Sequence, residues 1–331
     1  MSAESRPDVS VLMSVHNGMP YLVEATESIL AQGLRSWQFV IVNDGSTDTS
    51  VDYLDGLTDG RVQIVHQEQR GLAAALNHGI QHCRSDLIAR LDSDDVSLPS
   101  RLEKQVAYMR EHPQVGLLGT QFSRLGDSRA GFPSKLPSQH REIMDALMAG
   151  RHAMCHPTII CRKHLLESVG GYWEHPIAQD WDVYLKMGEV SELANLDEVL
   201  LHYRIHSSSL NGRKLAAIRH HQRYAAELAR RRQTGAPAID LADYSQMEEQ
   251  NSWAWRLRER LNEQAMNRYR SALTNILGNK PLLGYTQLGI AATISPSLTR
   301  QRIQRILEFR RADRAATPET SDRSTAMGKR A

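Results

Sequence analysis

The sequence predicts an α/β protein in which a mainly parallel sheet is flanked by helices and followed by a helical C-terminal extension. Across the first 120 residues, short apolar runs alternate with segments in which apolar side chains recur at helical spacing. Strands that alternate with helices indicate βαβ units, and such units build parallel sheets. Beyond residue 211 only the helical spacing continues, which predicts the extension.

Five strands are expected ahead of residue 121, each a short apolar run: Val9–Val15, Trp37–Asn43, Val62–His66, Leu87–Leu91 and Val115–Thr120. Four helices are expected among them: Tyr21–Gln32, Thr47–Leu57, Leu72–Cys83 and Ser100–His112. Ser100 and Glu103 have the spacing of a capping box, which predicts the start of the last helix, and Pro99 ends the preceding segment.

The pattern becomes more mixed between residues 121 and 210. Loop-forming residues fill Gly126–Pro137, and a Gly170-Gly171 turn follows later. The other segments are typical of a strand, two helices and a final strand: Thr158–Cys161, Lys163–Val169, a helix through Trp181–Met187, and Val199–His206. We expect them to extend the first domain and to cover its open face.

The expected helices of the extension are Lys214–Arg232, Leu241–Met266, Tyr269–Leu277 and Arg300–Arg314. The residues after them are polar and terminal, which is typical of disorder. The sequence thus predicts an α/β domain over residues 1–210, a basic helical region over 211–315 and a disordered tail over 316–331.

Composition restricts the class of protein. Only 3 cysteines occur in 331 residues, which excludes a disulfide scaffold, and 41% of the residues are hydrophobic, enough for a buried core. The first residues lack the apolar segment of a secretory signal, and no run of about 18 apolar residues is present to span a membrane. We therefore expect a cytoplasmic protein.

Charge divides the chain in two. Residues 1–210 contain 18 Lys and Arg against 27 Asp and Glu, whereas residues 211–331 contain 22 against 11. In Arg300–Arg314, apolar residues share one side of an arginine-rich helix, which indicates either an amphipathic helix on an anionic membrane surface or ordinary packing on the domain. Aromatic residues are not interleaved with the basic ones, so nucleic acid is not an expected partner.

The strongest chemical signal is the segment Asp92-Ser93-Asp94-Asp95, which follows an apolar strand. Three carboxylates in four residues repel one another unless a cation or several hydrogen-bond donors neutralise them. Hard oxygen ligands in an incomplete set suit Mg²⁺ or Mn²⁺ that also holds substrate phosphates. The alternative is a solvated acidic turn that caps a helix.

Two further carboxylates stand next to predicted helix starts. Asp44 ends a buried strand ahead of Gly45 and Ser46; it either binds a base or ribose, or belongs to a turn that leads into the next helix. Asp180 is placed to take a proton from an attacking hydroxyl if it reaches the cation site, or else only to cap its helix. Ligands of such sheets gather at the carboxyl ends of the strands, where we expect the chemistry.

Several common sites are excluded because their motifs are missing. The sequence has no GxGxxG or Walker A pattern, no C-x-x-C pair and no Gly-x-Ser-x-Gly elbow. The pairs His152/His156 and His202/His206 have a spacing that binds zinc only on a helix. Because the second pair falls in a predicted strand, structural roles are favoured for these histidines.

Seven short motifs, taken in chain order, resemble those of the family 2 glycosyltransferases. They are Val9–Asn17, Val42–Asp48, Arg90–Asp95, His156-Pro157-Thr158, Gly170-Gly171-Tyr172, Ala178–Asp182 and Leu200–His206. Each motif is short, and the specificity lies in their order, which runs from about Val9 to Ser209. Two positions depart from the usual pattern: Asn43 replaces an Asp, and Gln179 replaces the Glu that usually precedes the base.

The resemblance implies a GT-A fold, which is a Rossmann-type arrangement, and a nucleotide-diphospho-sugar donor, a divalent cation and inversion at the anomeric carbon. By position, Asp44 would contact the nucleotide base, Asp92 would lie by the donor ribose, diphosphate and metal, and Asp94 would ligate the metal. Asp180 would be the general base that deprotonates the acceptor hydroxyl. The remaining expected site residues are His16, Asn17, Arg70 and Gly71 in the nucleotide pocket, and His206 near the diphosphate or the metal.

We therefore expect a metal-dependent inverting glycosyltransferase of cell-surface polysaccharide assembly, acting on a glycan or lipid-linked glycan, in the cytoplasm or at the inner face of the cell membrane. One alternative is a sugar-phosphate nucleotidyltransferase. That enzyme would need a glycine-rich, basic loop after the first strand, and His16–Pro20 has one glycine and no Lys or Arg. The other alternative is a non-catalytic nucleotide-sugar-binding protein, which an activity assay separates.

Overall fold

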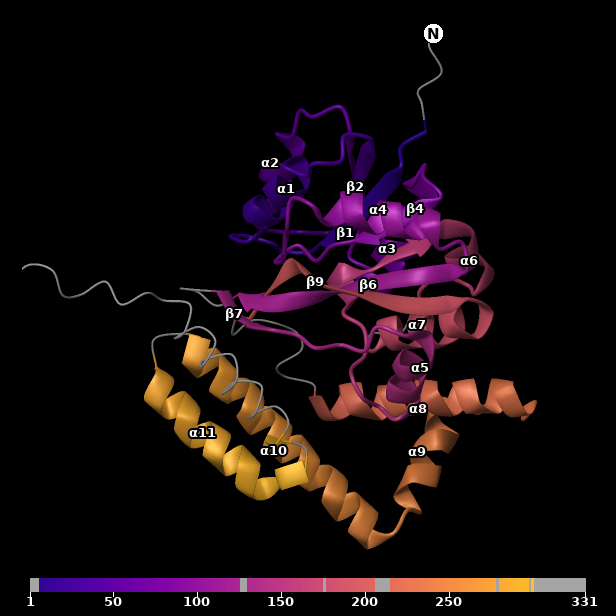
Figure 1. The fold of residues 1–331 in the computed structure, drawn as a ribbon, viewed down its shortest axis with the longest axis vertical. Coiled ribbons are helices and arrows are strands. Elements are labelled where there is room, and N and C mark those ends of the chain that lie inside the picture. The colour runs from indigo at the N-terminus through magenta and orange to yellow at the C-terminus, as the bar shows by residue number, and fades with distance from the viewer. Residues whose placement is uncertain are drawn as a thin grey trace, which may run out of the picture.

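The structure is a computed structural model that describes residues 6–125, 130–174, 177–205, 215–277, 280–297 and 299–300. One sheet of nine strands runs through it in the order β3-β2-β1-β4-β8-β6-β9-β5, with β7 paired to β6. Helices cover both faces of this sheet, and the last helices extend beyond it (Figure 1).

The first half of the sheet is a parallel arrangement of β1 (Val9–Val15), β2 (Trp37–Asp44), β3 (Val62–Gln67) and β4 (Leu87–Arg90). Parallel pairing joins β3 to β2, β2 to β1 and β1 to β4, so the carboxyl ends of these strands share one edge. The intervening helices are α1 (Leu22–Leu30), α2 (Ser50–Asp55) and α3 (Leu72–His82). These elements lie where the sequence predicts them, and the α/β fold class is confirmed.

The second half of the sheet is mixed rather than mainly parallel. Strand β8 (Ile160–Arg162) runs antiparallel to both β4 and β6 (Val115–Leu125). Strand β9 (Glu192–Arg204) is parallel to β6 but antiparallel to the short β5 (Val96–Ser97). The sequence does not predict β5, β7 (Ala130–Pro133) or the helix α5 (His140–Met148), and β9 begins seven residues before the expected Val199.

Each face of the sheet has its own core. Along β1, Val11 and Met13 pack on the side of α1, α2 and α4 (Arg101–Glu111), while Leu12 points to the opposite side. That second core holds α3, α5, α6 (Lys163–Ser168), α7 (Gln179–Val190) and α8 (Leu215–Thr234). Helix α8 therefore packs in the core of the α/β domain, although it lies beyond residue 210.

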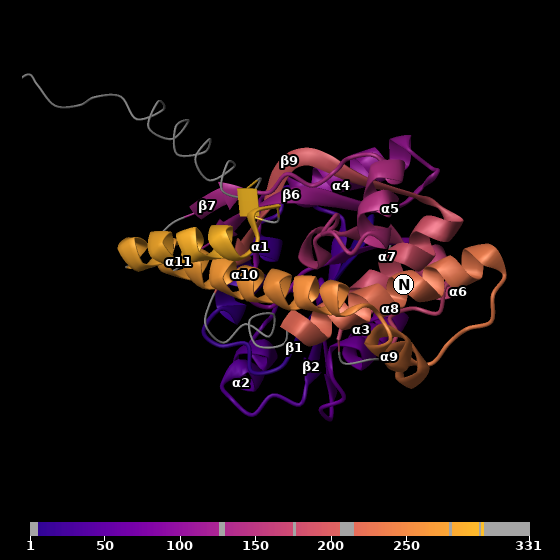
Figure 2. The same cartoon turned by 90° about the horizontal axis from the view of Figure 1, so that it is seen from below.

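The C-terminal region continues with α9 (Leu241–Glu249), α10 (Trp253–Leu277) and α11 (Pro281–Ile294). Helices α10 and α11 lie side by side and form a hairpin, as both views show (Figures 1 and 2). Among the described helices, none combines the length and apolarity needed to cross a bilayer. The expected tail and all but the first residue of Arg300–Arg314 lie outside the described residues.

The expected helices Leu241–Met266 and Tyr269–Leu277 are wrong in their division. The chain leaves the helical conformation after Glu249 and re-enters it at Trp253, and α10 then continues without interruption to Leu277. Ser252 explains the break: its hydroxyl accepts the N–H of Trp255 at 3.3 Å, and its carbonyl accepts that of Arg256 at 3.1 Å. It is a helix N-cap within a segment whose apolar spacing is otherwise continuous.

Candidate active site

The predicted site residues gather at the carboxyl edge of the parallel strands. His16 follows β1, Asp44 ends β2, and Asp92 stands two residues beyond β4. Because β1 lies between β2 and β4, these positions are neighbours in space. This edge is where sheets of this kind bind ligands.

The three carboxylates of the acidic segment form one cluster. Asp92, Asp94 and Asp95 each place an oxygen within 4.8 Å of the others. Asp95 is buried; its Oδ1 accepts the backbone N–H of Arg204 at 2.8 Å, and its Oδ2 has no hydrogen-bond partner among the described residues. Burial, together with the charges of Asp94 and Asp92, raises the pKa of Asp95 well above its ordinary value. An unpartnered buried carboxylate oxygen in an all-oxygen cluster fits Mg²⁺ or Mn²⁺.

Two arginines from different strands hold this acidic segment. Arg90 of β4 is 2% exposed and forms an ion pair with Asp92. Arg204 of β9 donates from Nε to the carbonyl oxygen of Asp94 at 2.8 Å, and its guanidinium pairs with Glu24 of α1. These cations offset part of the negative charge, yet they leave Asp95 Oδ2 without a partner.

Asp180 is the second residue of α7 and lies in its first turn. Burial raises the pKa of Asp180, the charge of Arg90 lowers it, and the charge of Asp92 raises it. Tyr184 lies one helical turn after Asp180 on the same face of α7, and its ring centre is 6.5 Å from that of His156. The backbone N–H of Arg90 donates to the carbonyl of Ile159, three residues after His156, so this face of α7 is turned toward the end of β4. Ala178, just before the helix, has a left-handed φ of 59°, and such strained residues cluster at functional sites.

Asp44 is engaged by the loop after β3. Its Oδ1 accepts the side-chain amide of Gln67 at 2.8 Å and the N–H of Arg70 at 2.7 Å, and its Oδ2 accepts the N–H of Gly71 at 2.8 Å. Gly71 has a φ of 92°, which glycine adopts without strain. The carboxylate thus fixes this loop at the edge of the site. Asp44 is only 3% exposed, so its contact with a nucleotide base stays a prediction.

His16 and Asn17 join the loops that follow β1 and β2. His16 Nδ1 lies 2.8 Å from the carbonyl oxygen of Asp44, and Asn17 Oδ1 accepts the N–H groups of Thr47 at 2.8 Å and Asp48 at 3.2 Å. Both residues are exposed, as are Arg70 and Gly71. They form an exposed rim along the edge of the sheet at which the acidic cluster lies. His206 lies outside the described residues.

Three further residues, His156, Tyr172 and Tyr184, have no role predicted from the sequence; the two tyrosines are buried and His156 is half-buried. His156 Nε2 lies 2.9 Å from the hydroxyl of Tyr172, and burial and the charge of Arg90 lower the pKa of His156 well below its ordinary value. Tyr184 of α7 is buried, and its hydroxyl has no hydrogen-bond partner among the described residues. His156 and Tyr172 belong to the short motifs around Pro157 and Gly171. Those motifs are the sequence signal from which a role for these two residues could have been predicted.

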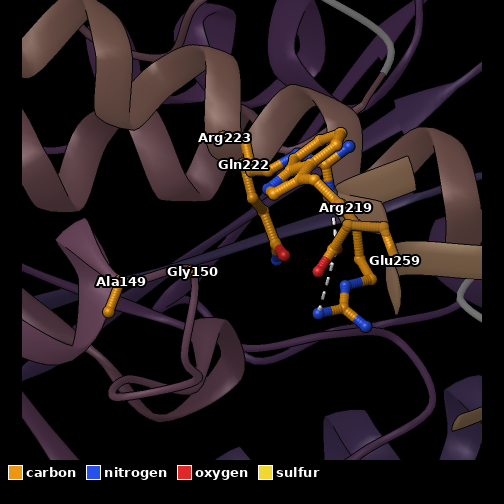
Figure 3. Close-up of a pocket in the computed structure, with 7 residues that line it drawn as sticks. Ala149, Gly150, Arg219, Gln222, Arg223 and Glu259 are labelled. Atoms are coloured by element: carbon orange, nitrogen blue, oxygen red, sulfur yellow. Dashed lines mark hydrogen bonds and ion pairs between the residues drawn. The ribbon is translucent and has the colours of Figure 1, made fainter. Parts of the chain in front are cut away.

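The cavity drawn in Figure 3 contains none of these residues. It lies between the end of α5 and the helices α8 and α10, and it is lined by Ala149, Gly150, Arg219, Gln222, Arg223, Trp255 and Glu259. Glu259 pairs with Arg223 at 3.2 Å and with Arg219 at 3.7 Å. These ion pairs join α8 to α10.

Comparison with known proteins identifies the class. Residues 10–170 match the family described as glycosyl transferase family 2. The chain is 33% identical to the O-antigen biosynthesis glycosyltransferase WbnJ of Escherichia coli over 63% of this chain and 84% of that protein. It is 30% identical to the amylovoran biosynthesis glycosyltransferase AmsE of Erwinia amylovora, over 62% of this chain and 79% of that protein.

The fold has a counterpart among solved structures. The crystal structure of S. aureus TarS 1-349 in complex with UDP matches with a TM-score of 0.54 and 15% identity, over 92% of this chain and 91% of that chain. Fold, acidic edge and relatives together define a glycosyltransferase. The chain belongs to glycosyl transferase family 2.

Proposed function

We propose that this protein is a metal-dependent inverting glycosyltransferase that transfers a sugar from a nucleotide-diphospho-sugar to a hydroxyl acceptor. The observation that carries the proposal is the clustering of the carboxylates of Asp92, Asp94 and Asp95 at the carboxyl ends of the strands, and the face of α7 that carries Asp180 is turned toward the end of β4. TarS structures contain UDP and UDP-GlcNAc, which supports the donor class.

The donor is proposed to lie on the rim beside the acidic cluster. His16, Asn17 and the turn at Arg70 and Gly71 would line the nucleotide pocket, with Asp44 holding that turn in place. Asp92 would lie by the ribose and diphosphate. The exposed guanidinium of Arg70 adds a positive charge where phosphate oxygens arrive.

The metal is proposed to bind Asp92 and Asp94, with the unpartnered oxygen of Asp95 behind them. When bound, Mg²⁺ or Mn²⁺ supplies the neutralising charge that a departing diphosphate needs. His206 stays a predicted neighbour of this group.

Asp180 is proposed to be the general base. It takes the proton of the acceptor hydroxyl, whose oxygen attacks the anomeric carbon while the bond from that carbon to the diphosphate oxygen breaks, and the configuration inverts. A raised pKa makes the carboxylate a stronger base, and the positive end of α7 favours its charged form.

The acceptor is proposed to be a glycan or lipid-linked glycan of bacterial cell-surface polysaccharide synthesis. The printed functions of WbnJ and AmsE, O-antigen and amylovoran biosynthesis, support this assignment. The excess of basic residues after residue 210 supports a location of the protein at the inner face of the cell membrane, because that surface is anionic.

The proposal is tested with Asp180→Asn and Asp94→Asn. We expect Asp180→Asn to lower the rate of transfer by about 10²–10⁴-fold, the contribution of a general base, while UDP-GlcNAc with Mn²⁺ still raises its melting temperature. Asp94→Asn should lose both transfer and the Mn²⁺-dependent rise. Asp145→Asn, an exposed residue on α5, is the control and should behave as the unmodified protein. Full turnover by Asp180→Asn would contradict the assigned base.

A further inference from the structure

The hairpin of α10 and α11 exposes a large share of the apolar surface. Six of the eight large apolar side chains that are exposed in the described part of the chain lie on these two helices. On α10, Trp253 is 72% exposed, and Leu257 and Leu261 follow at steps of four residues. On α11, Leu283 and Ile290 are exposed and, seven residues apart, share one face.

Helix α10 packs against α11 and α8 with other faces than the one that carries Leu257 and Leu261. Tyr269, Leu273 and Ile276 of α10 form a core with Leu288 of α11, and Glu259 faces α8 through its ion pairs (Figure 3). An α-helix turns about 100° per residue, so Leu257 and Leu261, each two residues from Glu259, lie on the opposite side of α10. The apolar surface therefore points away from the α/β domain.

Helix α11 is unusual in its composition. Pro281–Ile294 contains no charged residue, yet the helix lies at the periphery of the molecule (Figures 1 and 2). A helix without charged residues is normally buried. Its surroundings are cationic: residues 253–300 contain 7 Lys and Arg against 2 Asp and Glu, and Arg260 and Arg268 are exposed.

The hairpin also adjoins the candidate active site. Ile205 packs against the core between α10 and α11. It directly follows Arg204, which holds the carbonyl of Asp94 and the carboxylate of Asp95. The hairpin therefore lies between its exposed apolar face and the strand end that holds the acidic cluster.

We propose that α10 and α11 dock on the surface of an anionic lipid bilayer. Trp253, Leu257 and Leu261, with Leu283 and Ile290, enter the headgroup region, and the arginines contact lipid phosphates. Apolar side chains bordered by cations are the pattern that such a surface binds, whereas a second copy of the same face would bring like charges together. The inference rests on the proposed function in that it places the site beside a membrane-anchored acceptor.

The test is co-sedimentation of the full chain with vesicles of phosphatidylcholine, with or without phosphatidylglycerol. We expect binding to the anionic vesicles only, weakened by salt. Leu257→Gln/Leu261→Gln should reduce the vesicle-bound fraction at least about tenfold, because two apolar side chains no longer enter the interface. The matched control is Val190→Gln on α7, which is 54% exposed and should bind as the unmodified chain does.

A second variant tests the charge and guards against misfolding. Arg260→Glu/Arg268→Glu should lose the anionic vesicles, while Arg141→Glu on α5 should not. The proposal is overturned if the unmodified chain ignores anionic vesicles, or if both double variants bind as it does. It is also overturned if Leu257→Gln/Leu261→Gln converts a dimer into a monomer, or if a chain ending at residue 300 loses all binding while both double variants keep it.

Vesicle binding and donor binding are separate readouts. The hairpin variants should keep the rise in melting temperature with UDP-GlcNAc and Mn²⁺, because their substitutions lie outside the acidic cluster. Vesicle binding by a protein that uses no nucleotide sugar would refute the proposed function and leave the docking surface intact.

Discussion

Arg90 brings a positive charge into the interior next to the acidic segment. In its ion pair with Asp92, the side chain of Arg90 is buried, whereas that of Asp92 is partly exposed. The Nε and Nη1 atoms of Arg90 have no hydrogen-bond partner among the described residues. Burial lowers the pKa of Arg90, but the charge and hydrogen bond of Asp92 outweigh that effect and raise it. The guanidinium therefore stays charged and offsets carboxylates that would otherwise repel one another.

The buried pair predicts a large effect of Arg90→Met on stability. Removing one partner of a buried ion pair leaves the other charge uncompensated, so we expect the free energy of unfolding to fall by about 3 kcal/mol. The measurement is urea denaturation. Arg110→Met is the matched control, because Arg110 pairs with Asp8 at the surface with 62% of its side chain exposed, and such pairs contribute about 1 kcal/mol or less. Equal losses in the two variants would mean that burial of Arg90 is unimportant.

At the scale of single residues, the sequence predicts which site residues lie together when they stand close to one another along the chain. Asp92 and Asp94 stand in one short segment, so their clustering can be predicted from spacing alone. Asp180 could be assigned only through the resemblance, because the direction in which it points depends on how α7 packs. Arg90 lies in the motif Arg90–Asp95, but its position in a strand does not predict which charge lies across from it.

Helices α8, α9 and α10 are joined by a half-buried cluster around Glu248. Its carboxylate accepts hydrogen bonds from Arg223 Nε at 2.6 Å and from the Tyr244 hydroxyl at 2.8 Å, and His220 Nδ1 lies 2.7 Å away. Burial alone would raise the pKa of Glu248, but these hydrogen bonds outweigh it and hold the pKa below its ordinary value. The cluster fixes α9 against α8.

The lowered pKa of Glu248 predicts how stability depends on pH. A carboxyl group whose pKa is lower in the folded state stabilises the fold above its unfolded pKa of about 4.3, and this contribution is lost as the pH falls through the lowered value. The free energy of unfolding should therefore fall less steeply below about pH 5 in Glu248→Gln than in the unmodified protein. Denaturation at a series of pH values measures it. The neighbouring Glu249→Gln should keep the original slope, and an unchanged slope in Glu248→Gln would contradict the assignment.

The helices and strands are predicted well where a single spacing of apolar residues dominates the segment. The strands β1 and β2 are rich in apolar residues and almost wholly buried, and their bounds agree with expectation to within one residue. Strand β5 has two residues and exists because it pairs with β9, a tertiary contact that no local pattern contains. The break before α10 was missed because the cap at Ser252 competes with apolar spacing that runs through it.

At the scale of the molecule, the acidic and basic halves of the sequence do not coincide with separate cores. Ala225, Ala226 and Ala229 of α8 are buried with Trp181 and other residues of α7. The ring of Tyr224 lies 5.8 Å from that of Trp173. The basic region thus contributes its first helix to the α/β domain, while the hairpin of α10 and α11 forms its own small core.

This packing makes the predicted domain boundary at residue 210 testable. A fragment of residues 1–210 lacks α8 and leaves apolar side chains of α7 in water, at about 25 cal/mol for each Å² uncovered. A fragment of residues 1–236 retains α8, which ends at Thr234. We expect the longer fragment to unfold in one cooperative thermal transition and the shorter one to aggregate or to melt at a lower temperature, as measured by calorimetry. If both fragments melt together, the α/β domain is complete at residue 210 and α8 is only an attachment to it. If only the longer fragment melts cooperatively, the α/β domain includes α8. The hairpin is then joined to the catalytic fold through α8, which is a core helix of that fold.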